Sequence, residues 1–170
     1  ALPTTEMSHG PGILWLRKDW MEKLGLAAPV TMEDIEEILR RFVEEDPGGN
    51  GAGKTVGLLC SPEIAGDSGG LYMLNSVFTL YGAFPKQWIE RTDGSVVYGS
   101  IQPEMKDALE EVTKLYQEGL LDQQFLLRTE EDCQELLTNG ICGAFFGNYW
   151  SSEILPDSLL KNPQADWTPY

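Results

Sequence analysis

The chain has 170 residues, of which 42% are hydrophobic and 23% charged, values typical of one globular domain. Its 12 Lys and Arg stand against 27 Asp and Glu, which gives a formal net charge of −15. A body this acidic repels phosphate backbones and anionic headgroups, so neither nucleic acid nor a membrane surface is an expected partner. The sequence also lacks a run of about 18 apolar residues that could span a bilayer.

The cysteines and the histidine do not form the pattern of a metal centre or a catalytic triad. Cys60, Cys133 and Cys142 are odd in number and lack metal-ligand spacing. We interpret them as small buried apolar side chains, with a bridge between Cys133 and Cys142 as the alternative. His9 stands alone in a Gly/Pro-rich stretch, so neither a zinc site nor a Ser-His-Asp triad is expected.

The first part of the chain predicts two helices after a loop entry. Apolar residues three or four apart predict a short amphipathic helix over residues 13–24, which a strand through Leu14 and Trp15 could precede. A second helix has Thr31 as its N-cap and stops before Pro47.

The middle of the chain alternates loops with short ordered segments. Turn residues on both sides of an apolar run predict a buried strand, and Thr-Asp-Gly between two β-prone segments predicts a hairpin. In chain order we expect a Gly-rich loop at 46–55, a strand at 56–60, a loop at 61–70, a helix at 71–81, and a hairpin of 88–89 with 95–98.

The second half predicts two more helices and one more strand. A helix opens at Pro103 and stops at Gly119, and another covers residues 130–138. Residues 141–146 form a second buried strand, and the Pro-rich tail 155–170 is expected to be mostly loop. Helices alternating with short strands predict the α/β class, weighted towards helix.

The segment 48–55 fits the phosphate-binding pattern G-x-x-x-x-G-K-[ST]. A P-loop requires a strand before the loop and a helix after it, so that the free N–H groups of the helix face the phosphates. Here a well-capped helix precedes the loop and an apolar strand follows it. The order is inverted, and a P-loop nucleotide hydrolase is therefore the weaker alternative.

The same loop has the shape of a calcium-binding loop that has lost part of its ligands. Asp46 stands at the first position and Gly51 at the sixth, where such loops turn sharply. The third and ninth positions need oxygen ligands but hold Gly48 and Lys54. We expect Asp46 and the Asn50 side-chain oxygen to point at the centre, with the Lys54 ammonium in or near the place of a cation, or alternatively in solvent. No metal and no cofactor is therefore expected, and calcium binding is in doubt.

Several motifs resemble one protein family, and they occur in that family's order over most of the chain. The family is that of the extracellular solute-binding lipoproteins of bacterial ABC importers, in particular family 1, the oligosaccharide-type group. The matching segments are LWLRKDWMEKLGL at 14–26, PVTMED at 29–34, FVEEDPGGNGAGKTVGL at 42–58, IQPEMK at 101–106, LYQEGLLD at 115–122, GAFFG at 143–147 and NPQADW at 162–167.

The resemblance implies one helix-rich lobe, with a small sheet, of a two-lobed periplasmic-binding-protein-like (type II) fold. Residues 1–170 then form a single domain, the second lobe in chain order, excised from a longer chain. The resemblance also implies solute uptake without enzymatic activity. The implied partners are an oligosaccharide or other small solute and the membrane permease of an ABC importer. The whole protein would be an extracellular cell-surface lipoprotein, with its signal and lipid anchor outside this chain.

Candidate ligand contacts follow from where polar and aromatic residues leave the predicted strands. Asn148, Tyr149 and Trp150 come directly after a buried strand, where α/β sheets tend to bind ligands. Trp150 could instead cap the core of the lobe. Ser68 and Gly69 precede a predicted helix and are the second set of candidates.

Two points remain, namely the role of Trp88 and an alternative to solute binding. Trp88 at the head of the hairpin is assigned to packing. A surface protein that keeps this fold but works only through protein interactions is the remaining alternative to solute binding.

Overall fold

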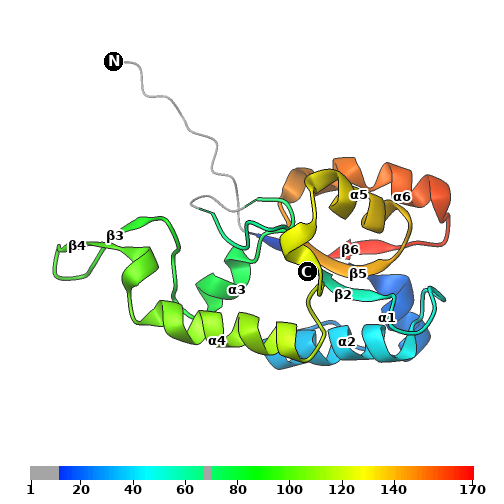
Figure 1. Cartoon of the computed structure of the whole chain (residues 1–170), viewed down its shortest axis with the longest axis horizontal. Coiled ribbons are helices and arrows are strands. Elements are labelled where there is room, and N and C mark those ends of the chain that lie inside the picture. The colour runs from blue at the N-terminus through cyan, green and yellow to red at the C-terminus, as the bar shows by residue number, and fades with distance from the viewer. Residues whose placement is uncertain (1–11, 67–69) are drawn as a thin grey trace, which may run out of the picture.

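The structure is a computed structural model that describes residues 12–66 and 70–170. A four-stranded sheet with helices on both faces forms the body, and an arm with a two-stranded hairpin extends to one side (Figure 1). This is the α/β class expected from the sequence. The elements are β1 (Ile13–Arg17), α1 (Lys18–Leu24), α2 (Met32–Glu45), β2 (Val56–Leu59), α3 (Asn75–Leu80), β3 (Trp88–Glu90), β4 (Val96–Tyr98), α4 (Glu104–Gln117), α5 (Glu130–Thr138), β5 (Cys142–Gly147), α6 (Pro156–Lys161) and β6 (Trp167–Pro169), with 3-10 turns at Gly99–Ile101, Phe125–Leu127 and Tyr149–Ile154.

The sheet is mixed, with the strand order β2-β5-β1-β6. β2 and β5 run parallel, while β1 is antiparallel to both β5 and β6. Helices α5 and α6 cover one face of the sheet, and α1 and α2 cover the other (Figure 1). The sheet therefore has a separate hydrophobic core on each face.

The helix expected over residues 13–24 covers only the second part of that range, and the strand through Leu14 and Trp15 that could precede it is confirmed as β1. Leu14 and Leu16 pack into the core on the α2 face, whereas Trp15 packs into the core on the α5 face. A strand buried on both faces is apolar throughout, which hides its twofold alternation. The helix begins only at Lys18 and ends at Gly25, whose φ of 68° is the left-handed stop that the sequence predicts.

Helix α2 forms as predicted, with Thr31 as its N-cap. The Thr31 side chain accepts a hydrogen bond from the Asp34 amide at 3.2 Å, and the Asp34 carboxylate accepts the Thr31 amide at 2.9 Å. This reciprocal capping box satisfies amides that the first helical turn leaves free.

The buried face of α2 lies directly against the sheet through Phe42. An ideal Cβ on Gly143 of β5 would lie 2.3 Å from Phe42 Cδ2, so only glycine permits this approach. Trp20 of α1 meets the Phe42 ring edge-on at 5.2 Å. Phe42 and Trp20 thus join α1, α2 and β5 into one packed layer.

The tail 155–170 is more ordered than expected. Pro156 begins α6, where its missing N–H would have no helical partner in any case. Trp167 is only 8% exposed, and its strand β6 pairs with β1. The loop expected there is therefore wrong, and α3 (Asn75–Leu80) is shorter than the helix expected over 71–81.

The hairpin of β3 and β4 forms as predicted, but Trp88 does not pack into a core. Its side chain is 72% exposed, and it contacts Tyr98 on the opposite strand at a ring distance of 5.2 Å. Assigning Trp88 to packing was therefore wrong. A two-stranded hairpin has no second layer to cover its outer face.

The three cysteines are buried free thiols, as interpreted from the sequence, and no bridge joins Cys133 to Cys142. Burial raises the pKa of the Cys60 thiol to about 12 and that of Cys133 to about 11. These thiols are therefore protonated and unreactive at neutral pH.

Candidate functional site

Four strand ends meet at one edge of the sheet, which we call the carboxyl edge. The parallel strands β2 and β5 both end there. Ile13, at the start of β1, lies opposite Gly147 at the end of β5. Tyr170 follows β6 at the same edge and exchanges backbone hydrogen bonds with Leu14 at 2.8 and 3.1 Å. Residues far apart in the sequence thus converge where α/β sheets tend to bind ligands.

The predicted contact residues Asn148, Tyr149 and Trp150 leave the carboxyl edge directly after β5. Asn148 is 5% exposed, and it caps the following 3-10 turn through reciprocal hydrogen bonds with Ser151. Tyr149 is 56% exposed and Trp150 is half-buried, with their rings edge-to-face at 4.8 Å. The two aromatic rings therefore present a surface, whereas Asn148 has a structural role in the turn.

The second predicted set cannot be placed. Ser68 and Gly69 lie outside the described residues, as does His9. Ligand contact by Asn148, Tyr149, Trp150, Ser68 and Gly69 stays a prediction.

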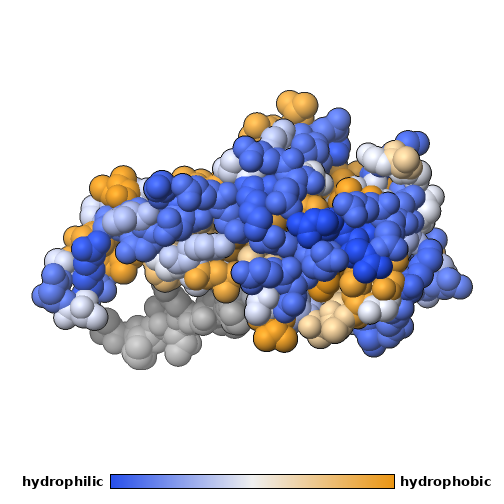
Figure 2. Space-filling model, turned by 90° about the horizontal axis from the view of Figure 1, so that it is seen from below, coloured by the Kyte–Doolittle hydropathy of each residue, from blue (hydrophilic) through white to orange (hydrophobic). Residues whose placement is uncertain are grey.

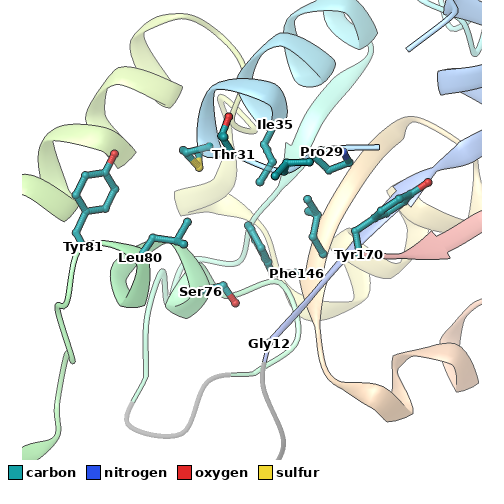
Figure 3. A pocket seen from close by; sticks show the side chains of 12 residues that line it. Gly12, Pro29, Thr31, Ile35, Ser76, Leu80, Tyr81, Phe146 and Tyr170 are labelled. Carbon is teal, nitrogen blue, oxygen red and sulfur yellow. The ribbon is translucent and has the colours of Figure 1, made fainter. Parts of the chain in front are cut away.

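A pocket of about 420 Å³ opens beside the carboxyl edge, on the α2 face of the sheet. The labelled side chains surround an open space, with Leu80 and Tyr81 on one side and Phe146 and Tyr170 on the other (Figure 3). None of the described residues that line it is charged, and Thr31, Ser76 and the two tyrosines supply side-chain polar groups. An apolar pocket with a few polar groups is typical of small-molecule sites.

The sequence did not reveal this pocket because its walls come from five separate segments. They are the start of β1, the entry to α2, the α3 segment, the end of β5 and Tyr170. The Tyr149 and Trp150 segment leads instead to the core on the α5 face, in which Leu155 is buried. The aromatic pair therefore shares one edge of the sheet with the pocket, while the residues that follow the pair pack on the opposite face from the pocket.

The Gly-rich loop has the inverted order that argued against a P-loop. It follows the C-terminus of α2 and leads into β2, which is not the strand-loop-helix order that a P-loop requires. The Asp46 carboxylate organises the loop by accepting three hydrogen bonds. Its Oδ1 accepts one from the Thr55 hydroxyl at 2.6 Å and one from the backbone N–H of Asn50 at 2.9 Å. Its Oδ2 accepts the third from the backbone N–H of Gly51 at 2.8 Å. Hydrogen-bond donors of the loop itself thus occupy both oxygens.

Asn50 and Lys54 do not take the roles expected in a cation loop. The Asn50 side chain donates from its nitrogen to Thr55 Oγ1 and to the Gly140 carbonyl. Lys54 is exposed, and the described residues include no ion pair between it and Asp46. Placing its ammonium inside the loop was therefore wrong, because backbone and hydroxyl donors already satisfy Asp46.

Hydrogen bonds make the stability of this loop depend on pH. Burial alone would raise the pKa of Asp46, but the bonds from Thr55, Gly51 and Asn50 outweigh it and lower the pKa below 3.8. A carboxyl group with a lowered pKa stabilises the fold above its unfolded-state pKa, and this contribution is lost as the pH falls through the folded-state value.

We expect Asp46→Asn to reduce the free energy of unfolding by about 1 kcal/mol at pH 7, because it removes charge-assisted hydrogen bonds. The difference from the wild type should disappear as the pH falls below the pKa of Asp46. Urea unfolding at several pH values measures it, with the exposed Asp107→Asn as control. A difference that persists unchanged into acid would contradict the assignment.

The residues that the structure describes contain no group of three or more His, Cys, Asp or Glu side chains arranged to hold a metal ion. Within the same ranges, every helix is too short or too polar to cross a bilayer.

No family model matches the chain, but it is similar to several known proteins. It is 28% identical, over 84% of its length, to the polygalacturonan/rhamnogalacturonan-binding protein YtcQ of Bacillus subtilis. It is 29% identical over 75% of its length to lipoprotein LipO of the same organism. An HMO-binding, ABC-transporter-associated solute-binding protein from Bifidobacterium longum infantis matches 95% of the chain, with a TM-score of 0.69 and 25% identity.

The chain is thus similar to a binding protein for a sugar polymer and to a solute-binding protein associated with an ABC transporter. Its fold is the periplasmic-binding-protein-like fold that the motifs implied. The chain spans 27% of YtcQ, 25% of LipO and 33% of the Bifidobacterium structure. It therefore corresponds to about one lobe of such proteins.

Proposed function

We propose that this chain is one lobe of an extracellular binding protein that captures oligosaccharides for uptake by an ABC importer. The observation that carries the proposal is the similarity to YtcQ, a binding protein for a sugar polymer, over 84% of the chain. The expected partner is the membrane permease of the importer, and the protein acts as a binder, not an enzyme. The similarity to LipO supports a lipid anchor in a part of the protein outside this chain.

The carboxyl edge is the proposed ligand surface of the lobe. Sugar rings present apolar C–H faces that stack on aromatic side chains, and their hydroxyls need a few hydrogen-bonding partners. Tyr149 and Trp150 supply exposed ring surface on one face of the sheet. Tyr81 and Tyr170 line the pocket on the other face.

We further propose that the solute is a neutral oligosaccharide. Within residues 12–66 and 70–170 the pocket lining carries no charged side chain, and the chain as a whole carries a net charge of −15. A polyuronate would meet repulsion without a compensating cation in the pocket. The lobe thus differs in its expected ligand class from YtcQ, whose name specifies acidic polymers.

The test is calorimetry on the intact protein with a panel of neutral oligosaccharides, oligogalacturonides and ATP with magnesium. We expect binding of a neutral oligosaccharide only. Binding of oligogalacturonides alone would contradict the neutral solute but keep the importer function. Stabilisation by ATP that depends on Lys54 would contradict the whole proposal in favour of a nucleotide site.

Replacing Trp150 by alanine in the intact protein is expected to weaken oligosaccharide binding by about 1–3 kcal/mol, the loss of one aromatic stacking partner. Trp88→Ala removes an exposed tryptophan on the distant hairpin and serves as the matched control, with no expected change in affinity. Unchanged affinity in Trp150→Ala, together with a lower melting temperature, would assign Trp150 to the core of the lobe.

We also propose that the loop at 46–55 functions without calcium, because loop donors occupy the Asp46 oxygens. Millimolar calcium or a chelator is expected to leave the melting temperature of the wild type unchanged. The double substitution Gly48→Asp with Lys54→Asp places acidic side chains at the third and ninth positions. An ideal Cβ at position 48 lies 2.5 Å from Trp20 Cζ2, so the variant should be less stable than the wild type without calcium and should gain stability when calcium is added. A wild-type melting temperature that rises with calcium would show that the loop still binds the metal.

A further inference from the structure

Two acidic side chains are buried where α2 meets α4. Glu36 on α2 is 7% exposed and Glu111 on α4 is 9% exposed. A single ammonium group, that of Lys114, lies 2.5 Å from Glu36 Oε1 and 3.8 Å from Glu111 Oε1. With both carboxyl groups ionised, this joint would hold one uncompensated negative charge away from water, which is strongly unfavourable.

The hydrogen bonds of Glu111 indicate where a proton would sit. Its Oε2 accepts the Tyr81 hydroxyl at 2.8 Å. Its Oε1 is fully buried and has no hydrogen-bond partner among the described residues. The carboxyl groups of Glu111 and Glu36 both lie within 4 Å of the Lys114 nitrogen, so the two are close neighbours. A proton on one of them would therefore turn two repelling acceptors into a donor and an acceptor.

We propose that Glu36 and Glu111 share one proton in the folded protein, and that this proton is a pH-sensitive link between α2 and α4. With the proton bound, the two carboxyl groups and Lys114 are together neutral. Once it is released, like charges face each other across the joint of the two helices. The outer face of these two helices is largely hydrophilic and open to solvent (Figure 2). Most of their charged side chains are therefore exposed, whereas Glu36 and Glu111 are buried.

Some of the neighbouring groups favour the protonated form of the acid pair, and others favour its ionised form. Glu33 on α2 acts on Tyr81, and Glu118 at the end of α4 acts on Lys114 but is itself paired with Arg40 of α2 at 2.6 Å. Lys114 and the Tyr81 hydroxyl favour release of the proton, because they stabilise the ionised Glu111. Burial and the proximity of Glu36 outweigh these two groups and raise the pKa of Glu111 above its ordinary value of 4.5. Burial also raises the pKa of Tyr81 to about 12, so its hydroxyl stays a donor.

The link reaches the pocket through Tyr81 and α2. Tyr81 forms part of the pocket wall, and its hydroxyl is held by Glu111 on α4 (Figure 3). Ile35 precedes Glu36 on α2 and lines the same pocket. Glu111 is thus a positioning residue for Tyr81, and the protonation of the acid pair sets how firmly α4 holds this wall against α2. The inference is independent of which solute binds.

The test compares the intact wild-type protein with Glu111→Gln in urea unfolding between about pH 4 and pH 9. A carboxyl group whose folded-state pKa is raised stabilises the fold fully below its unfolded-state pKa, and this contribution is lost as the pH rises through the folded-state value. Glutamine keeps the acceptor for Tyr81, supplies a permanent donor and does not titrate. Between the unfolded-state pKa and the folded-state pKa of the carboxyl group, the wild type should lose stability relative to the variant as the pH rises. Over that range we expect the ratio of the wild-type unfolding constant to that of the variant to rise by up to tenfold per pH unit.

The matched control is Glu110→Gln, which removes an exposed carboxylate of the next residue on α4. It should follow the wild-type pH dependence. Tyr81→Phe and Lys114→Met each remove a group that stabilises ionised Glu111. In both variants the pH at which the stabilisation by the bound proton is lost should therefore be higher than in the wild type. A merely structural role of Tyr81 or Lys114 would lower stability without changing this pH.

Parallel pH profiles for the wild type and Glu111→Gln would overturn the proposal. If Glu111→Gln does not fold, Glu36→Gln removes the same shared proton from the other side and is measured in its place. Carbon-13 NMR titration of glutamate carboxyl groups in the wild type gives an independent result. One buried glutamate should titrate well above pH 4.5, and two that both titrate near or below pH 4.5 would contradict the shared proton.

Discussion

Asp19→Ala is expected to lower the free energy of unfolding by about 3–5 kcal/mol, because it leaves the buried Arg17 without its counter-ion. Arg17 is 1% exposed, and its Nε and Nη2 each donate to an Asp19 carboxylate oxygen at 2.7 Å. The guanidinium also lies 4.6 Å from the centre of the Trp20 ring and 5.7 Å from that of Trp167. Thermal and urea unfolding measure the loss.

Two further variants identify the cause of that loss. Glu37→Ala removes a surface partner of Arg40 and should cost at most about 1 kcal/mol, since both side chains are exposed to water. Asp19→Ala combined with Arg17→Met removes both charges and should recover part of the stability. A single Asp19→Ala variant as stable as Glu37→Ala would show that Arg17 does not depend on this carboxylate.

Phe42→Ala is the second substitution with a large expected effect, a loss of about 3–5 kcal/mol in the free energy of unfolding. The side chain is fully buried, and it packs between Gly143 of the sheet and the edge of the Trp20 ring. The cavity left by its removal cannot close, because α2 is held at both ends by its capping box and by the Asp46 loop. Leu160→Ala, at a residue 80% exposed, is the control and should stay within about 0.5 kcal/mol of wild type.

A double-mutant cycle with Gly143→Ala examines the contact itself. The single Gly143→Ala change forces its new methyl against the Phe42 ring and should destabilise the protein. With Phe42 also shortened to alanine, the methyl loses its clash with Phe42 and keeps only the one with Trp20 Cζ3, 2.9 Å from an ideal Cβ, so the combined loss should be smaller than the sum of the two. Additive losses would mean that α2 and β5 are not in direct contact at this point.

The sequence predicted those elements whose signals are local. The Thr31 cap, the stop at Gly25 and the turn of the hairpin each depend on a few neighbouring residues, and the structure shows all of them. Strand β1 was difficult to predict because burial on both faces removes the alternation that marks a strand. Strand β6 is only three residues long, and its pairing with β1 is a tertiary contact without a local pattern.

The candidate site was predictable only in part for the same reason. Tyr149 and Trp150 could be found because they directly follow a strand that was recognisable. Tyr170 and Tyr81 belong to the pocket only through the topology of the sheet and the path of α3. The acid pair of Glu36 and Glu111 resembled ordinary solvated helix positions in the sequence, because burial of a charged face depends on the packing of two distant helices.

The pairing of Leu14 with Tyr170 has a mechanical consequence. The chain enters the sheet and leaves it at the carboxyl edge, on two adjacent antiparallel strands. A pulling force applied through residues 12 and 170 therefore acts on the Leu14–Tyr170 hydrogen bonds first and on each following pair of the β1–β6 ladder in turn. Bonds that break one at a time resist far less force than bonds that share the load. Under tension β6 should peel away first, and β1 would stay paired with β5.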